Sequence, residues 1–151
     1  DFTDRKNTLS EVPSEVSAEI DILTVAHNWS LFMSNDKKFA ELETYLIKNS
    51  YQYNVALQYA TGVDITFVAN HILANPAFTE NTVTNFKWIA DNCFSVDLHF
   101  IKHMLIRSGT QKVDDTTNDR FYFVKWDDTE DGINNPTWKI ASMREIINNG
   151  N

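Results

Sequence analysis

The chain has 151 residues and a mass of 17.4 kDa, with 42% hydrophobic and 13% aromatic residues and a net charge of −8. These values predict one globular domain, and the acidic balance disfavours a nucleic-acid backbone or an anionic membrane surface as a partner. A single cysteine, Cys93, excludes an intrachain disulfide framework, and no stretch approaches the roughly 18 consecutive apolar residues of a membrane-spanning helix.

The polar residues 1–13 predict an N-terminal extension, which leaves residues 14–151 as the single domain. The extension contains no apolar run of the kind found in signal peptides. A soluble protein is therefore expected. The sequence leaves its compartment unknown, with the cytoplasm favoured and secretion after signal removal left open.

Two helices are expected to follow as a hairpin. Ser14 and Glu15 suit a helix N-terminus, and apolar residues at helical spacing continue to about Ser34. Asp36 can cap a second helix that runs through Lys48.

Residues 51–59 alternate apolar and polar side chains, which predicts a strand. Asp64 can then cap a short third helix over residues 65–74. This helix is expected to stop at the Asn75-Pro76 pair, because a residue before proline avoids the helical region.

A run of long antiparallel strands completes the predicted domain. The strands cover residues 82–90, 93–107, 120–126 and 137–147, and residues 108–118 form a loop or a ragged strand extension. The helices then cover one face of a curled sheet, which is an α+β fold.

The strand over residues 93–107 is the centre of this arrangement. Its alternate positions from Phe94 to Phe100 are apolar, whereas Asp97, His99 and His103 share the opposite face. These three side chains raise the question of a metal site or an acid–base pair. A strand rises ~3.3 Å per residue, so the two histidines lie roughly 13 Å apart and cannot share a metal ion. No metal is expected, and the three residues mark an outer sheet face that is either solvated or pressed against a second subunit.

Three segments of this chain resemble the nuclear transport factor 2-like superfamily, in its SnoaL-like and ketosteroid-isomerase-like branch: HNWSLFMSNDKKFAELETYLI, TGVDITFVANHIL and NPTWKIASMREII. The resemblance extends from about Ser14 onward. It implies a cone in which a bent sheet wraps the helices around an apolar pocket. It also implies a homodimer formed through the outer sheet face.

The resemblance implies catalytic positions as well, and this chain departs from them. In the ketosteroid-isomerase-like branch, a carboxylate on the first strand is the general base, but this chain has the amides Gln52 and Asn54 there. Oxyanion donors would fall near Asn28 or Trp29 and near Tyr122. Residues 82–90 hold no histidine, so the dehydratase pattern is absent too.

The first functional hypothesis is therefore a SnoaL-like domain with an apolar pocket for a small hydrophobic molecule, without a cofactor and without the standard isomerase machinery. The ligand-binding candidates are Trp29, Tyr53, Trp88, Trp126 and Met143. The second hypothesis is a cofactor-independent lyase, isomerase or hydrolase, with His27, Tyr45 and Tyr122 as catalytic candidates. A third is a purely structural dimerisation module.

Overall fold

A computed structural model describes residues 8–9, 12–31, 38–61, 72–128 and 135–147. Within these ranges the helices are α2 (Ser14–Ser17), α3 (Ile22–Leu31), α4 (Lys38–Leu42) and α5 (Tyr51–Ala60), with the 3-10 helix η1 (Glu43–Tyr45). The strands are β1 (Thr8–Leu9), β2 (Ile72–Ala90), β3 (Cys93–Ile106), β4 (Gln111–Trp126) and β5 (Thr137–Glu145).

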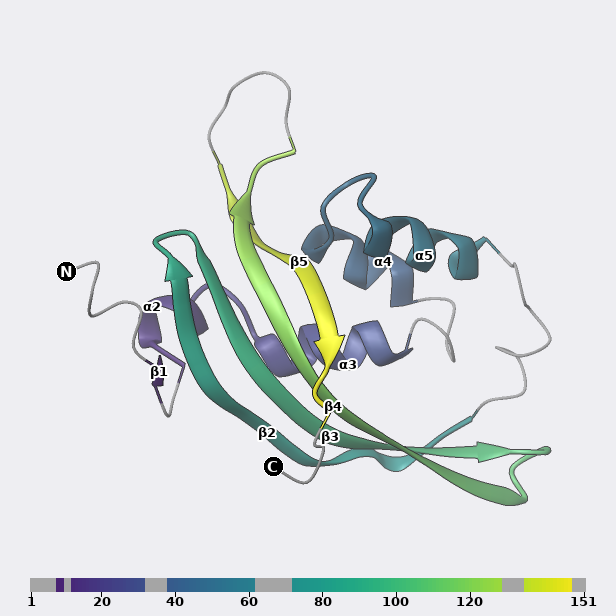
Figure 1. The fold of residues 1–151 in the computed structure, drawn as a ribbon. Coiled ribbons are helices and arrows are strands. Elements are labelled where there is room, and N and C mark those ends of the chain that lie inside the picture. The colour runs from purple at the N-terminus through teal and green to yellow at the C-terminus, as the bar shows by residue number, and fades with distance from the viewer. Residues whose placement is uncertain (1–7, 10–11, 32–37, 62–71, 129–134, 148–151) are drawn as a thin grey trace.

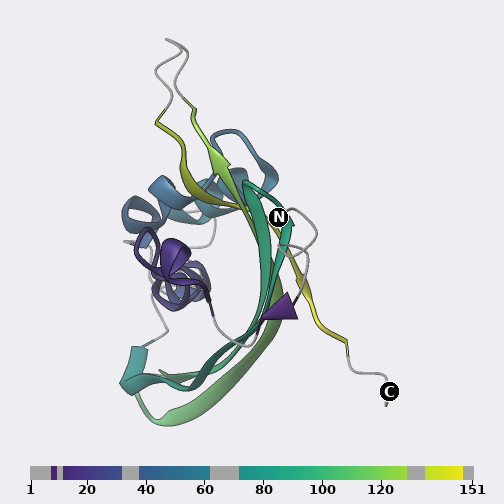
Figure 2. The same ribbon diagram turned by 90° about the vertical axis from the view of Figure 1, so that its left-hand side faces the viewer.

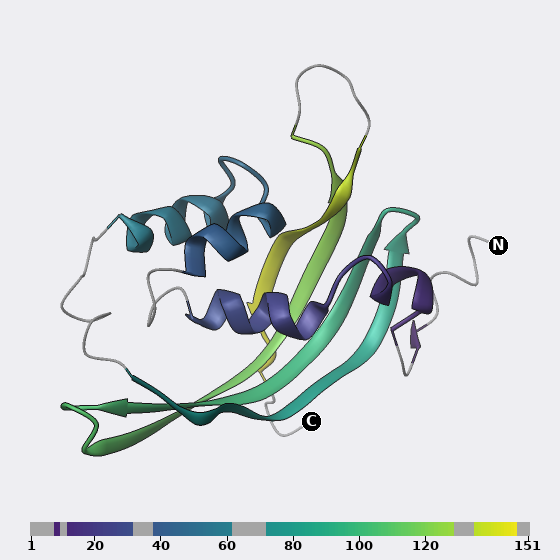
Figure 3. The same ribbon diagram turned by 180° about the vertical axis from the view of Figure 1, so that it is seen from behind.

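The strands form one antiparallel sheet in the order β1-β2-β3-β4-β5 (Figure 1). Figure 2 shows that this sheet is strongly curved and that the helices lie on its concave side. Seen from behind in Figure 3, α3 crosses the long strands while α4 and α5 lie further from β2. The predicted α+β fold, with a curved antiparallel sheet around N-terminal helices, is confirmed.

The central position of β3 is also confirmed, because it pairs with β2 on one side and with β4 on the other. Its alternate residues Phe94, Val96, Leu98 and Phe100 are at most 1% exposed and face the helices. Burial of a large apolar side chain contributes about 1.5–3 kcal/mol. Strand β3 therefore contributes more buried apolar side chains to the core than any other described strand.

The predicted helix over residues 14–34 is interrupted in the structure. The Asp21 carboxylate accepts hydrogen bonds from the backbone N–H of Thr24 at 3.2 Å and from its hydroxyl at 2.8 Å. An aspartate in this position caps a new helix. The chain consequently forms α2 and α3 separately, and the predicted residues 32–34 lie outside the described ranges.

The predicted second helix, residues 36–48, is too long at its C-terminus. Regular α-helix ends at Leu42, one 3-10 turn follows, and Leu46 is already extended at φ −112° and ψ 144°. Leu46 forms a parallel bridge with Ile140 and is 1% exposed, so packing against β5 ends the helix. Residues 36–37 lie outside the described ranges.

The predicted strand over residues 51–59 is wrong, because this segment is helix α5. The Ser50 side chain accepts a hydrogen bond from the backbone N–H of Tyr53 at 3.3 Å, which starts the helix. Ala56 is fully buried, and Tyr53 packs edge-on against Phe39 with ring centroids 5.7 Å apart. Tertiary packing and the cap thus outweigh the period-two pattern.

Strand β2 begins earlier than expected. Residues 72–74 of the predicted third helix belong to this strand, and residues 65–71 lie outside the described ranges. Residues 111–118 are regular strand, so β4 is longer than the predicted segment 120–126. A short turn joins β3 to β4, with positive φ at Arg107, Ser108 and Gly109.

The predicted N-terminal extension takes part in the sheet, since Thr8 pairs with Lys87 and Leu9 with Phe86. Among the residues that the structure describes, no helix is long and apolar enough to cross a membrane.

Candidate functional site

A hollow of about 170 Å³ lies between α3 and the concave face of the sheet. Helix α3 contributes one wall, and β3 and β4 contribute the floor. The lining residues are Ala26, Trp29, Ser30, Phe100, Lys102, Asp115, Thr117, Asp119 and Phe121. We call this hollow the concave pocket.

The register of β3 and β4 puts polar side chains on the floor of the concave pocket. Thr117 pairs with Phe100, Asp115 pairs with Lys102, and Asp119 pairs with Leu98. Directly paired residues of antiparallel strands share one face of the sheet. The polar positions are therefore on the same face as the buried row of β3, in the part of the sheet under α3.

Lys102 is the most unusual of these side chains, because it is only 5% exposed. Its ammonium donates a hydrogen bond to the backbone carbonyl of Ser30 at 2.8 Å and lies 4.0 Å from the carboxylate of Asp115. Burial lowers the pKa of Lys102, and the charge of Asp115 opposes this effect. An ammonium has three donors, and the Asp115 distance is too long for a hydrogen bond. Lys102 therefore has donor capacity towards the concave pocket.

Asp119 complements the lysine. Burial, together with the negative charges of Glu145 and Asp115, raises the pKa of Asp119. Its carboxyl group thus keeps a proton to a higher pH than an exposed aspartate does. A carboxyl group of this kind can donate a hydrogen bond or transfer a proton.

His27 lies next to the concave pocket, in contact with its lining residue Phe100. Its ring stacks on Phe78 with centroids 3.9 Å apart and meets the Phe100 ring edge-on at 4.8 Å. Its Nε2 lies 2.7 Å from the side-chain oxygen of Asn81 and so donates to it. Burial is the largest influence on His27 and lowers its pKa. The neutral ring is held between aromatic neighbours.

Among the predicted ligand-binding residues, Trp29 lines the concave pocket. Trp88 is buried in an aromatic cluster with Phe86, Phe94 and Trp138. Trp126 is 45% exposed and donates to Asp128 at 2.7 Å. Tyr53 and Met143 are partly buried against the hydrophobic core.

The other predicted catalytic residues lie elsewhere. Tyr45 ends η1 and is partly buried against the core. Tyr122 pairs with Ser95 on the outer face, where hydrogen bonds from Arg144 and then Arg120 lower the pKa of its phenol. The structure does not bring His27, Tyr45 and Tyr122 together at the concave pocket.

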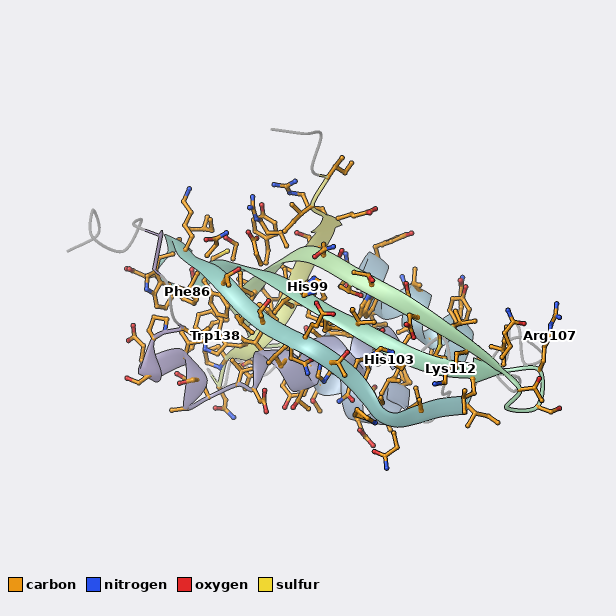
Figure 4. The ribbon with its side chains drawn as sticks, turned by 90° about the horizontal axis from the view of Figure 1, so that it is seen from below. Phe86, His99, His103, Arg107, Lys112 and Trp138 are labelled. Carbon is orange, nitrogen blue, oxygen red and sulfur yellow. The ribbon has the colours of Figure 1, made fainter. Side chains whose placement is uncertain are left out.

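Asp97, His99 and His103 lie on the outer face, which Figure 4 views from the side opposite the helices. Each has its own polar partners on the neighbouring strand β4. Asp97 contacts Arg120 at 2.6 Å, His99 contacts Asn118 at 2.6 Å, and His103 contacts Asp114 at 2.7 Å.

Within the described ranges, no group of three or more His, Cys, Asp or Glu side chains is arranged to hold a metal ion.

The residues that the sequence interpretation missed are Lys102, Asp115 and Asp119. Asp115 falls in the segment interpreted as a loop, and Asp119 directly precedes the predicted strand. Two features of the sequence point to them. Lys102 interrupts the apolar row of β3. Residues 119, 117 and 115 continue, towards the start of β4, the every-second-residue pattern that places Phe123 and Phe121 on the inner face.

No family model matches the sequence, and no curated protein matches it. The chain is similar to a solved structure of an NTF2-like (nuclear transport factor 2-like) protein of unknown function in nutrient uptake from Rhodospirillum rubrum. The two are 12% identical with a TM-score of 0.46, and the match covers 85% of this chain and 100% of that chain.

Proposed function

We propose that the concave pocket binds a small, mostly apolar organic molecule that carries one hydrogen-bond-accepting oxygen. Lys102 supports this proposal most strongly. A buried ammonium is costly unless its donors are satisfied, and the described contacts of Lys102 satisfy one donor fully. A carbonyl or carboxylate oxygen in the concave pocket would satisfy another.

The walls support an apolar body for this ligand. Trp29, Phe100 and Phe121 line the concave pocket beside Lys102. Aromatic faces of this kind hold flat rings, while a few polar groups fix the orientation. The volume of about 170 Å³ is below the roughly 300–1,000 Å³ of pockets for drug-sized ligands, so the ligand is small.

A pair of probes with the same shape tests the proposal. Acetophenone carries a carbonyl oxygen, whereas ethylbenzene does not, and isothermal titration calorimetry measures the affinity of each. We expect acetophenone to bind about tenfold more tightly, the equivalent of one hydrogen bond to a charged donor. Lys102→Met should abolish this preference.

Lys87→Met is the matched control, because Lys87 is an exposed lysine on the neighbouring strand β2. It should leave both affinities unchanged. Failure of both probes to bind, or an equal affinity of the native protein for the two, would overturn the proposal.

Asp119 supports a second candidate, a cofactor-independent lyase or isomerase. Its raised pKa and the lowered pKa of Lys102 make the two groups candidates for proton transfer on a bound ligand. Asp119→Asn separates the two functions. Loss of turnover with binding retained would favour the enzyme, and unchanged turnover would exclude Asp119 as the proton-transfer group.

The homodimer through the outer face stays a prediction, as does the structural dimerisation role. Sedimentation of the native chain tests both. A purely structural role requires a dimer and predicts that neither probe binds in the concave pocket.

A further inference from the structure

Residues 79–81 of β2 each contact a different histidine. Thr79 contacts His103 and Glu80 contacts His99, both on β3, whereas Asn81 contacts His27 on helix α3. The register of β2 against β3 shifts between Thr79 and Thr82, and Glu80 has a positive φ of 57°. Such bulges re-aim side chains and occur next to active sites.

The contacts of His103 have the geometry of a nucleophile–base–carboxylate triad. Thr79 Oγ1 lies 2.6 Å from His103 Nε2, and His103 Nδ1 lies 2.7 Å from Asp114 Oδ1. An ionised carboxylate only accepts, so Nδ1 carries the hydrogen in the neutral ring. Nε2 then accepts the hydroxyl hydrogen of Thr79, as a general base does towards a hydroxyl nucleophile.

A hollow of about 240 Å³ gives access to this group. Between the pairs Leu73–Met104 and Phe78–Lys102, four residues of β2 stand opposite the single residue His103. Strand β2 bends there, as Figure 4 shows. Residues 74–76 of this bend line the hollow. Thr79, His103, Asp114 and Lys112 line it together with Asn75 and Met104.

We propose that Thr79, His103 and Asp114 carry out acyl transfer from a small activated ester to water. Thr79 Oγ1 forms a bond to the ester carbonyl carbon while its proton passes to His103 Nε2. The ester C–O bond breaks, and the leaving alcohol takes that proton. Water then attacks the acyl-threonine through the same base, which releases the acid and restores Thr79.

Two further features define the site. The positively charged Lys112 lines the same hollow, where it suits the oxygen that becomes negative in the transition state. The Asp114 side chain is 61% exposed and that of His103 is 26% exposed. An open site of this kind accepts small esters and excludes little water, so the turnover is slow.

The outer face supplies a matched control. His99 is on the same strand and the same face as His103, but among the described residues its side-chain partners are Asn118 and Glu80, neither of which carries a hydroxyl group. His99→Asn should therefore leave acyl transfer intact, whereas His103→Asn should abolish it.

The test uses p-nitrophenyl acetate with the full chain. We expect release of p-nitrophenol above the buffer rate, an added acetyl mass on the intact protein, and peptide mapping of that acetyl to Thr79. Thr79→Val should lower the rate by about 100-fold, since general-base catalysis contributes roughly 10²–10⁴. Thr79→Ser should retain activity, and circular dichroism verifies the fold of each variant.

Asp114 is a positioning residue in this scheme, because it orients the ring. Asp114→Asn keeps the shape of the side chain but lets it donate to Nδ1, which favours the wrong tautomer. We expect kcat to fall while KM stays unchanged. Acetylation confined to lysine or histidine side chains, or an unchanged rate in folded His103→Asn, would overturn the proposal.

Discussion

Arg120 binds the Asp97 carboxylate at two points on the outer face, through Nε at 2.6 Å and Nη2 at 3.1 Å. Asn85 donates a third hydrogen bond to the same carboxylate at 2.9 Å. Burial alone would raise the pKa of Asp97. The hydrogen bonds from Arg120 and Asn85 and the charges of Arg120 and Arg144 together outweigh burial and lower it. These hydrogen bonds link the neighbouring strands β2, β3 and β4.

We predict a pH-dependent loss of stability in Asp97→Asn. A lowered folded-state pKa stabilises the protein above the unfolded value, about 3.9, and this contribution disappears as the pH falls through the folded value. The variant should lose about 1–2 kcal/mol at pH 7 and less at pH 3, because the loss shrinks progressively below the unfolded value. Urea denaturation at the two pH values measures the difference. An equal loss at both would contradict the role of the ionised carboxylate.

Lys102→Met should change binding without unfolding the protein. The buried ammonium carries a desolvation cost, and methionine fills a similar volume without it. We expect a free energy of unfolding equal to or up to about 1 kcal/mol above the native value. Denaturant titration measures this value. A clear loss of stability would show instead that the hydrogen bond from Lys102 to the Ser30 carbonyl stabilises the packing of α3 on the sheet.

Asp119→Asn should stabilise the protein at neutral pH. Because the pKa of Asp119 is raised, the folded protein holds this proton at pH values where the unfolded chain has released it. Stability therefore falls as the pH rises from the unfolded value through the folded value. Removing the charge should recover about 0.5–1 kcal/mol at pH 7. The gain should vanish below pH 3, as thermal unfolding at both pH values can measure.

Ser50→Ala should destabilise helix α5. The Ser50 hydroxyl accepts from the Tyr53 backbone N–H, and loss of such a cap costs about 1 kcal/mol. Chemical denaturation measures the effect. Gln58→Ala, at an exposed position inside the same helix, should be nearly neutral. Equal effects of the two variants would argue against the cap.

The sheet could be predicted from the sequence because β3 has apolar side chains at every second residue. A period-two pattern of this length is rare in helices. Helix α5 shows the limit of this signal. Residues 51–59 have the same alternation, and only the capping Ser50 and the fully buried Ala56 identify a helix. The burial of Ala56 depends on tertiary contacts, and the cap depends on a single side chain. A pattern of hydrophobicity contains neither kind of information.

The candidate site was harder to predict than the fold. Trp29 was identified from its place on an apolar helix, but Asp115 lies in a polar stretch that resembles a loop. It becomes strand because Lys102, 13 residues earlier, pairs with it across the hairpin. Thr79 has no distinguishing pattern in the sequence, and it shares a face with His103 because the register of β2 against β3 shifts between Leu73 and Phe78.

The next shift in register, between Thr79 and Thr82, limits how this chain can vary in length. Glu80 and Asn81 together stand opposite the single residue Phe100, so loss of one of them would leave one side chain where two now contact His99 and His27. Single substitutions there affect one histidine each. Among relatives of this protein, we therefore expect insertions and deletions to avoid this segment more strictly than amino-acid replacements do.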